Sequence, residues 1–243
     1  MTKKIIIVGA TSGIGMAVAQ LFIEAGWKVG IAGRREEKLR KIAASAPSQV
    51  IYSVIDICDK DAGAHLLDMI QQMGGLDYYF HSSGMGKQNS SLDLPIEIAT
   101  TETNVTGFVR MVDTVFNYFK ENGGGHIGVV SSIAGTKGLG SAPAYSATKR
   151  FNNTYIQCLA QLAHMQKYPI TFTDIKPGFV DTALLNSESN YPMMMSVPKV
   201  ARSIFKALIA KKRKKIIDWR FTILVFFWKC IPDAVWERLL ISN

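Results

Sequence analysis

Three side chains of this sequence have the types and the spacing needed to move a proton. Tyr145 and Lys149 are four residues apart, so on a helix they share one face. A nearby ammonium group favours the phenolate and lowers the pKa of a tyrosine toward neutrality. Such a tyrosine can protonate a carbonyl or deprotonate an alcohol. Ser132 precedes this pair at the end of an apolar run, where its hydroxyl could hold the same substrate oxygen.

A glycine-rich turn near the start of the chain has the spacing of a phosphate-binding loop. Gly9, Gly13 and Gly15 follow the apolar run 5–8 and precede a helical pattern. Gly9 permits a tight exit from a strand, Gly13 lets the backbone approach a phosphate, and Gly15 allows close helix–strand packing. The helix N-terminus then presents unpaired N–H groups to an anion. The predicted phosphate site also includes Thr11, Ser12 and Ile14. An ordinary glycine-rich turn is the alternative.

The residues after the second apolar run indicate which dinucleotide binds. Dinucleotide folds often place an acid there to bind the ribose hydroxyls, whereas this chain has Gly33, Arg34 and Arg35. Guanidinium groups form charge-assisted hydrogen bonds with phosphate, so the sequence favours NADP(H) over NAD(H). The alternative is that both arginines only solvate the start of a helix. Asp56, after the third apolar run, could contact the adenine amine or cap the next turn.

Short apolar runs alternate with longer helical patterns, and together these elements must position the chemistry. Strands are expected at 5–8, 28–32, 50–54, 77–80, 126–131, 171–175 and 216–218, and helices at 16–25, 36–44, 61–73, 103–120, 142–166 and 198–210. Strands separated by helices of this length need crossover connections and therefore form a parallel sheet. We predict an α/β fold with a Rossmann-type doubly wound parallel sheet of about seven strands and helices on both faces.

Five motifs in this order resemble the short-chain dehydrogenase/reductase family, in its shorter single-domain branch. The motifs are Gly9-x-x-x-Gly13-x-Gly15, Asn104-Val105-Thr106-Gly107, Ser131-Ser132-Ile133-Ala134-Gly135, Tyr145-x-x-x-Lys149 and Lys176-Pro177-Gly178-Phe179-Val180-Asp181-Thr182. The resemblance covers about residues 3–210 and implies an NAD(P)-dependent enzyme that acts on CH–OH groups.

The resemblance also implies a role for each matching residue. Tyr145 would be the general acid/base, and Lys149 would bind the nicotinamide ribose and lower the Tyr145 pKa. Ser132 would orient the substrate carbonyl, and Asn104 would hold a water in a proton relay. The remaining cofactor contacts would come from Ser83, Gly84, Pro177, Gly178, Val180 and Thr182. No metal is implied.

Several positions depart from the family pattern. The family usually has Asn-Asn-Ala-Gly after the fourth strand, whereas this chain has His81, Ser82, Ser83 and Gly84. His81 is then a bracing or cofactor-lining residue, with a second catalytic base as the alternative. A basic residue often found before the second glycine of NADP enzymes is Ser12 here, so the NADP preference rests on the two arginines.

These observations predict an NADPH-dependent oxidoreductase that interconverts a carbonyl and a secondary alcohol. A substrate loop is expected at 183–197, and its leucine, tyrosine and methionine residues favour a hydrophobic or lipid-like substrate over simple packing on the protein's own core. A catalytically idle NADP-binding sensor or scaffold on the same fold is the alternative. Dehydratase or epimerase chemistry also fits this scaffold.

Composition narrows the function classes further. With 48% hydrophobic and 19% charged residues among 243, the chain is too apolar to be disordered. Three distant cysteines argue against a disulfide framework, so a reducing, cytoplasmic location is expected. No secretory or spanning segment is visible. Of the net charge of +9, residues 199–243 carry all but one unit. The remaining body is nearly neutral, which argues against a nucleic-acid partner.

The end of the chain differs from the catalytic domain predicted at 1–218. The extension 219–243 is aromatic and follows the basic run Lys211–Lys215, and Asp233 could cap a short helix at 233–240 with one apolar side. Basic residues beside Trp and Phe resemble an interfacial membrane anchor, so contact with a membrane through 211–240 is expected. The alternative is that the extension covers the domain's own core or a subunit interface.

The helix expected at 103–120 suggests how copies of the chain could associate. Its apolar residues exceed what one sheet face needs: Val105, Phe108, Val109, Val112, Val115, Phe116 and Phe119. A homodimer or homotetramer is therefore expected.

Overall fold

In the computed structural model, which describes residues 2–182 and 191–241, every named strand joins one parallel sheet. The strands are β1 Lys4–Val8, β2 Lys28–Gly33, β3 Val50–Val54, β4 Tyr78–His81, β5 Gly125–Val130, β6 Ile170–Lys176 and β7 Lys214–Ile216. Their order across the sheet is β3-β2-β1-β4-β5-β6-β7, and each pairing is parallel. The predicted doubly wound α/β fold is confirmed.

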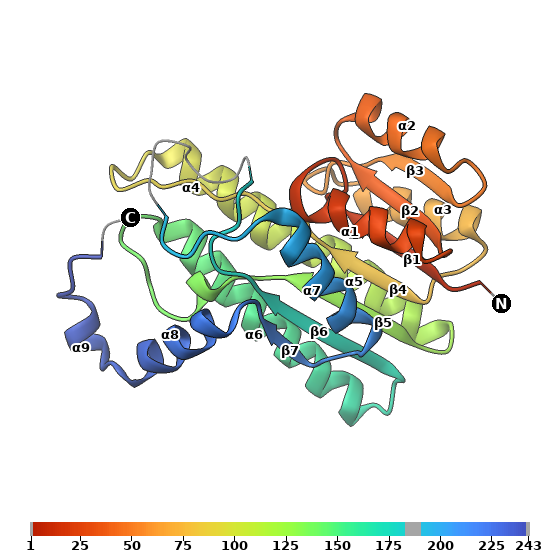
Figure 1. The fold of residues 1–243 in the computed structure, drawn as a ribbon. Coiled ribbons are helices and arrows are strands. Elements are labelled where there is room, and N and C mark those ends of the chain that lie inside the picture. The colour runs from red at the N-terminus through yellow and green to blue at the C-terminus, as the bar shows by residue number, and fades with distance from the viewer. Residues whose placement is uncertain (1, 183–190, 242–243) are drawn as a thin grey trace.

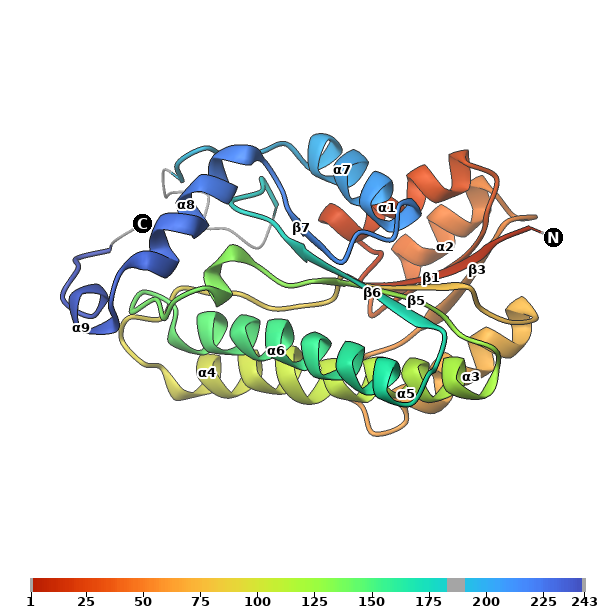
Figure 2. The same ribbon diagram turned by 90° about the horizontal axis from the view of Figure 1, so that it is seen from below.

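Helices cover both faces of this sheet, as Figures 1 and 2 show. One layer contains α1 Gly13–Glu24, α2 Glu36–Ser45 and α7 Val197–Ile209, and the other contains α3 Ala62–Met73, α5 Phe108–Glu121 and α6 Pro143–Met165. Each layer packs on the sheet through its own apolar cluster, so the buried side chains form two cores. Both sheet faces are therefore shielded from water, which explains the continuous apolar runs of the strands.

The sheet order places a crevice beside β1. This strand lies between β2 and β4, so the chain winds away from it in both directions. Open α/β sheets bind ligands at such a switch point, outside the carboxyl ends of the strands. The glycine-rich turn after β1 and the segment after β4 therefore meet at the expected ligand site.

The helix predicted at 103–120 is part of a longer helical run. It starts with α4 Leu94–Thr101, continues as a π-helical segment Glu102–Gly107, and then becomes α5. The sequence analysis missed α4 entirely. Single π turns inside α-helices are frequently found at functional sites, and this one contains Asn104.

The apolar residues of α5 are used within the chain itself. Phe108, Val112, Val115, Phe116 and Phe119 are all buried in the core under the sheet. These residues therefore do not exceed what one chain can cover, contrary to the expectation, because the sheet and the neighbouring helices α3 and α6 bury them. Two other residues of that set, Val105 and Val109, stay half-buried.

The last strand begins two residues earlier than expected and includes part of the basic run. β7 covers 214–216 rather than 216–218, and the Lys211 ammonium lies 5.6 Å from the centre of the Tyr78 ring. Tyr78 is the first residue of β4, so the basic run starts at the edge of the sheet where the strands begin. The end of the run, Lys214 and Lys215, lies in β7, which α8 follows and contacts, so this part of the run adjoins the aromatic extension.

The extension forms two helices, α8 Trp219–Cys230 and α9 Asp233–Trp236. The sequence analysis did not predict α8, which starts where the Asp218 carboxylate accepts a hydrogen bond from the Arg220 backbone N–H at 3.1 Å. The helix expected at 233–240 is shorter, and the Asp233 carboxylate pairs with the Lys137 ammonium instead of capping it. No helix in the described ranges combines the length and the apolar character needed to cross a bilayer.

The two faces of α8 have different surroundings. Phe221 and Val225 are buried in the same core as α1 and α7. Trp219, Phe226 and Phe227 are 70%, 63% and 59% exposed. The extension therefore covers the domain's own core with one face and presents aromatic side chains to solvent with the other.

Candidate active site

The turn after β1 is built so that only glycine fits at its key positions. A Cβ on Gly9 would lie 2.6 Å from the Ser83 backbone nitrogen, and Gly9 has a φ of +87°. A Cβ on Gly15 would lie 2.2 Å from the Gly9 carbonyl oxygen. Gly13, with a φ of +52°, faces the Thr182 side chain. The backbone thus forms an open cradle between β1 and β4, which fits the pyrophosphate of a dinucleotide.

The two arginines after β2 lie in different places. Arg35 crosses the glycine turn: its Nη2 donates to the Thr11 hydroxyl and to the Ser12 hydroxyl, both at 2.6 Å. The Arg34 guanidinium is largely exposed and lies 3.8 Å from the Asp56 carboxylate. Asp56 also accepts a hydrogen bond from the Cys58 backbone N–H at 3.0 Å, so it does cap the following turn.

Ser132 and α6 meet closely after β5. The Ser132 hydroxyl accepts a hydrogen bond from the Ala134 backbone N–H at 3.1 Å and so starts a single 3₁₀ turn. A Cβ on Gly135 would lie 2.6 Å from the Lys149 carbonyl carbon, so this glycine allows the turn to pack directly on α6. Ser132 is thereby brought to Tyr145 and Lys149, one helical turn apart on α6.

Burial controls the proton affinities of this pair. Lys149 is buried, its ammonium donates to the Val130 carbonyl at 3.1 Å, and burial lowers its pKa to about 8. Burial raises the pKa of Tyr145, and a hydrogen bond with Ser132 opposes this rise. The hydrogen bond with Ser132 is thus a contribution that lowers the Tyr145 pKa, and the expectation that Lys149 lowers it as well stays a prediction. The Lys149 ammonium lies 5.8 Å from the centre of the Tyr145 ring.

A buried carboxylate that sequence analysis missed lies beneath the pair. Asp174 of β6 accepts a hydrogen bond from the Ser131 hydroxyl and pairs with the Lys176 ammonium at 3.2 Å. Its charge raises the pKa of Lys149 and so opposes the effect of burial. The available signal was an acid two residues from a lysine in an otherwise apolar and hydroxyl-bearing strand, since an unpaired buried carboxylate is costly.

Asn104 lies behind the site and holds its backbone. Its side-chain amide bonds both backbone groups of Met85, accepting from the N–H at 2.8 Å and donating to the C=O at 2.7 Å. Its own carbonyl accepts from the Asn152 amide at 2.8 Å. Asn104 therefore fixes the segment after β4, and its expected role in holding a water stays a prediction.

His81 is enclosed at the end of β4. Its Nδ1 lies 2.8 Å from the Tyr79 hydroxyl, and burial together with the Lys149 charge lowers its pKa to about 3. The imidazole is therefore neutral at physiological pH. A buried, neutral histidine suits the bracing interpretation better than that of a second catalytic base.

The comparisons with known proteins agree with this geometry. A family model described as "short chain dehydrogenase" matches residues 3–192. The chain belongs to the short-chain dehydrogenase family. It is accordingly an oxidoreductase of the dehydrogenase/reductase type.

Similar proteins come from distant organisms. Dehydrogenase/reductase SDR family member 7B of Xenopus tropicalis is 26% identical, over 98% of this chain and 84% of that protein. An uncharacterized oxidoreductase of Staphylococcus aureus strain MW2 is 34% identical, over 76% of this chain and 81% of that protein.

Two solved structures share the short-chain dehydrogenase fold with this chain. A short-chain dehydrogenase from Streptomyces avermitilis has a TM-score of 0.82 at 21% identity, covering 93% of this chain and 92% of that one. A variant of actinorhodin polyketide ketoreductase with NADPH has a TM-score of 0.76 at 22% identity, covering 89% of this chain and 95% of that one.

In this short-chain dehydrogenase the predicted site residues gather in one cleft of about 1160 Å³. The cleft is lined by all of them except Gly15, which packs against Gly9, and Asn104. Sequence analysis missed several further lining residues: Met85, Lys87, Gln88, Leu139, Phe179 and Trp228. Most of them lie in loops whose path only the folded chain defines, and Trp228 comes from α8.

The substrate loop expected at 183–197 is partly described. Residues 183–190, with both leucines, lie outside the described residues. Tyr191 lines the cleft and packs on Phe179 with ring centroids 5.0 Å apart. Met195, in contrast, is buried in the core, where it pairs with Val180 in an isolated bridge. α7 then begins at Val197.

Proposed function

We propose that this short-chain dehydrogenase is an NADPH-dependent carbonyl reductase with Tyr145 as its general acid/base. The observation that carries the proposal is the convergence of Ser132, Tyr145 and Lys149 in the cleft that starts at the glycine cradle. A sensor or scaffold has no need of a positioned acid, whereas carbonyl reduction requires one.

Each catalytic residue of the cleft has a separate role in the reaction. NADPH, when bound, supplies the hydride. The Ser132 hydroxyl orients the substrate carbonyl, and the Tyr145 hydroxyl donates the proton to the carbonyl oxygen. The Lys149 ammonium binds the nicotinamide ribose and stabilises the phenolate that Tyr145 becomes. In the alcohol-to-carbonyl direction the same phenolate accepts the proton.

The preference for NADPH is supported by the position of Arg35. NADP enzymes of this family often have a basic residue before the second glycine of the turn, and that residue is Ser12 here. Arg35 reaches the same place in space, because its guanidinium bonds the Ser12 hydroxyl. Arg34 lines the same cleft from beside Asp56, so its guanidinium is a second candidate for the 2′-phosphate. A ketoreductase of similar fold is described with NADPH.

The cleft wall favours a hydrophobic carbonyl compound as substrate. Leu139, Phe179, Tyr191 and Trp228 are among the residues that line the cleft. Aromatic and aliphatic walls with a few polar groups are typical of sites for apolar small molecules.

The proposal is tested with a panel of carbonyl compounds and NADPH, by following the loss of reduced-cofactor absorbance. We expect turnover, and we expect Tyr145→Phe to lower it by about 10²–10⁴-fold while NADPH still binds. Near-normal turnover in Tyr145→Phe would overturn the mechanism. Tight NADPH binding without turnover of any compound would favour the idle sensor.

A pair of stacked aromatic residues on α6 bears on the assembly of the enzyme. We infer a cytoplasmic homodimer or homotetramer, in which the half-buried Phe151 and Tyr155, stacked at 5.3 Å on α6, belong to a subunit contact. Light scattering measures the mass, and a monomer would contradict this inference.

We also infer peripheral contact with a membrane, through the outer face of α8 rather than through the basic run. Its exposed residues Trp219, Phe226 and Phe227 lie on one side of the helix, at helical spacing. Arg220 and Lys229 flank this side near the two ends of the helix. Aromatic residues with flanking cations are typical of interfacial helices.

A further inference from the structure

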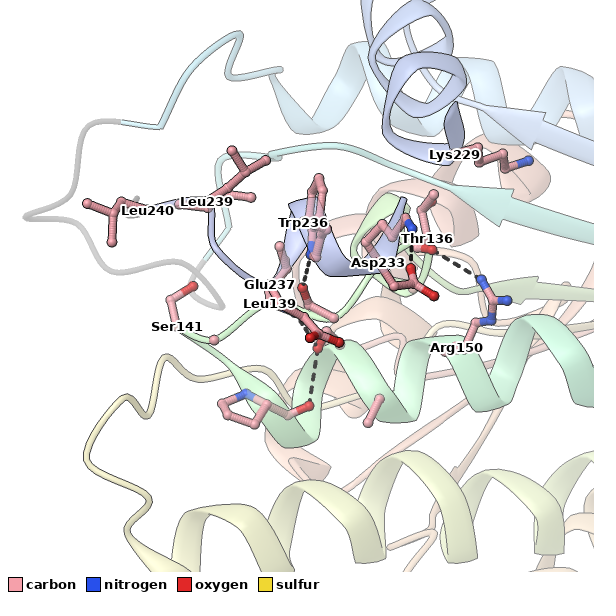
Figure 3. A pocket seen from close by; sticks show the side chains of 18 residues that line it. Thr136, Leu139, Ser141, Arg150, Lys229, Asp233, Trp236, Glu237, Leu239 and Leu240 are labelled. Atoms are coloured by element: carbon pink, nitrogen blue, oxygen red, sulfur yellow. Dashed lines mark hydrogen bonds and ion pairs between the residues drawn. The ribbon is translucent and has the colours of Figure 1, made fainter. Parts of the chain in front are cut away.

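A second cavity, of about 1060 Å³, lies between the start of α6 and the C-terminal segment. Its walls come from the loop 135–141, from the first turns of α6, and from α9 with the residues that follow it. Figure 3 shows Trp236 of α9 pointing toward the loop that carries Leu139, with Leu239 and Leu240 farther along the segment. We call this cavity the C-terminal groove.

The C-terminal groove adjoins the catalytic cleft. Leu139 and Ser141 line both cavities. On α6 the neighbouring residues Tyr145 and Ser146 line the cleft and the groove, respectively. Trp228 of the cleft and Trp236 of the groove are in edge contact, with ring centroids 5.2 Å apart. A ligand held at Tyr145 therefore needs to pass only one loop to enter the groove.

Specific contacts hold the outer wall of the groove in place. The Trp236 indole N–H donates to the Gly138 carbonyl at 2.6 Å. The Lys137 ammonium donates to the Ile231 carbonyl at 2.9 Å and pairs with the Asp233 carboxylate. These contacts join the extension to the very loop that connects Ser132 with Tyr145, so the groove and the catalytic residues are positioned together.

The chemistry of the groove favours an uncharged, apolar occupant. Its charged residues nearly balance, with Lys137, Arg150 and Lys229 against Asp233 and Glu237. Its apolar residues include Leu239 and Leu240, and both are exposed to solvent. An aliphatic ligand that covers these exposed leucines removes their apolar surface from water, which favours binding.

We propose that the C-terminal groove binds the distal aliphatic chain of a long-chain carbonyl substrate whose oxygen is held at Ser132 and Tyr145. This inference rests on the proposed reductase function and adds a substrate class to it. Short carbonyl compounds would occupy the cleft alone, and longer ones would extend past Leu139 to Leu239 and Leu240.

The first test is a series of straight-chain ketones from butanone to dodecanone, reduced with NADPH. We expect kcat/KM to rise by up to about fourfold per methylene once the chain passes Leu139, because each buried methylene adds hydrophobic binding. The double variant Leu239→Asp/Leu240→Asp should lose most of this rise and leave the value for butanone unchanged. Both positions are exposed, so the fold tolerates the change. Phe227→Asp, exposed on α8 outside the groove, is the matched control.

A binding measurement separates this inference from the proposed function. Calorimetry with dodecanol in the full-length Tyr145→Phe protein does not depend on turnover. Binding that the double aspartate variant weakens at least tenfold, and that Phe227→Asp keeps, supports the groove even if no ketone is reduced. Turnover that does not depend on chain length, or dodecanol binding unchanged in the double variant, overturns the inference.

Discussion

Arg34 and Arg35 are adjacent in sequence but make different contacts, and this difference predicts how each contributes to cofactor binding. Arg35 is already held over the phosphate cradle by Thr11 and Ser12. Arg34 projects into solvent beside Asp56, whose carboxylate competes for its charge. A side chain that is fixed before binding loses less conformational entropy when the ligand arrives.

We expect Arg35→Ala to raise the Kd for NADPH about ten- to a hundredfold, because it removes charge-assisted hydrogen bonds to the 2′-phosphate. Arg34→Ala should have a smaller effect in the same direction. The Kd for NADH should change little in either variant. Fluorescence titration measures each Kd, and Arg40→Ala, which removes an exposed partner of Glu36, is the control. An equal loss for both cofactors would mean that the arginines do not discriminate between them.

The charge of Asp174 leads to a second prediction, on the pH dependence of the reaction. Its negative charge raises the pKa of Lys149, which burial lowers to about 8. Asp174→Asn removes the charge, so the pKa of Lys149 should fall further and the ammonium should be lost at lower pH. We expect the alkaline limb of the kcat/KM profile to move to lower pH. Asp113→Asn on α5, whose carboxylate accepts from the Tyr155 hydroxyl away from the cleft lining, should leave the profile unchanged. An unshifted profile in folded Asp174→Asn protein would show that this charge does not act on the site.

At the scale of single elements, substitutions in α8 test whether the extension is part of the domain core. Phe221 is 0% exposed, and its ring fills the space beside Gly178, where a Cβ would lie 2.2 Å from it. Phe221→Ala should lower the free energy of unfolding by about 3–5 kcal/mol. Phe227→Ala, on the exposed face of the same helix, should change it by less than about 0.5 kcal/mol. Urea unfolding measures both, and equal effects would contradict the packing described for α8.

The same elements show what the sequence can predict. β1 to β6 and the catalytic pair on α6 follow from local patterns: apolar runs, glycines and the four-residue spacing of Tyr145 and Lys149. α8 could not be found this way, because its apolar residues surround the helix and carry no period. The bounds of β7 were also mispredicted because its local sequence carries no strand pattern. Its lysines resemble a solvated turn, and only pairing with Asp174, Ile175 and Lys176 makes them a strand.

The residues of the cleft likewise fall into those that local sequence predicts and those that it does not. The glycine turn, Ser132, Tyr145 and Lys149 were predictable, since their chemistry depends on spacing within short segments. Trp228 was not, because its place in the cleft depends on how α8 docks against segments far away in the chain.

At the scale of the whole molecule, the exposed face of α8 predicts binding to lipid vesicles. The double variant Phe226→Asp/Phe227→Asp should bind vesicles of anionic lipid less than the unmodified chain, because it loses apolar burial and adds negative charge. Binding of the unmodified chain should weaken as salt rises, since the charge attraction is screened. Co-sedimentation measures the bound fraction.

The matched control for this experiment is Leu94→Asp/Ile98→Asp on α4, where both side chains are also exposed. A chain ending at Asp218 is a poorer comparison, since it would also remove Phe221 from the core. Equal vesicle binding by the two double variants would mean that α8 is not the lipid-binding face.

The contact between Phe221 and Gly178 also has a consequence for folding of the protein. Every strand of the described sheet precedes α8 in the chain, so the sheet does not need α8 in order to pair its strands. In any molecule whose sheet has formed while α8 is still undocked, the apolar surface beside Gly178 faces water and the cleft lacks Trp228. We expect chaperones to bind this uncovered surface until α8 folds onto the sheet.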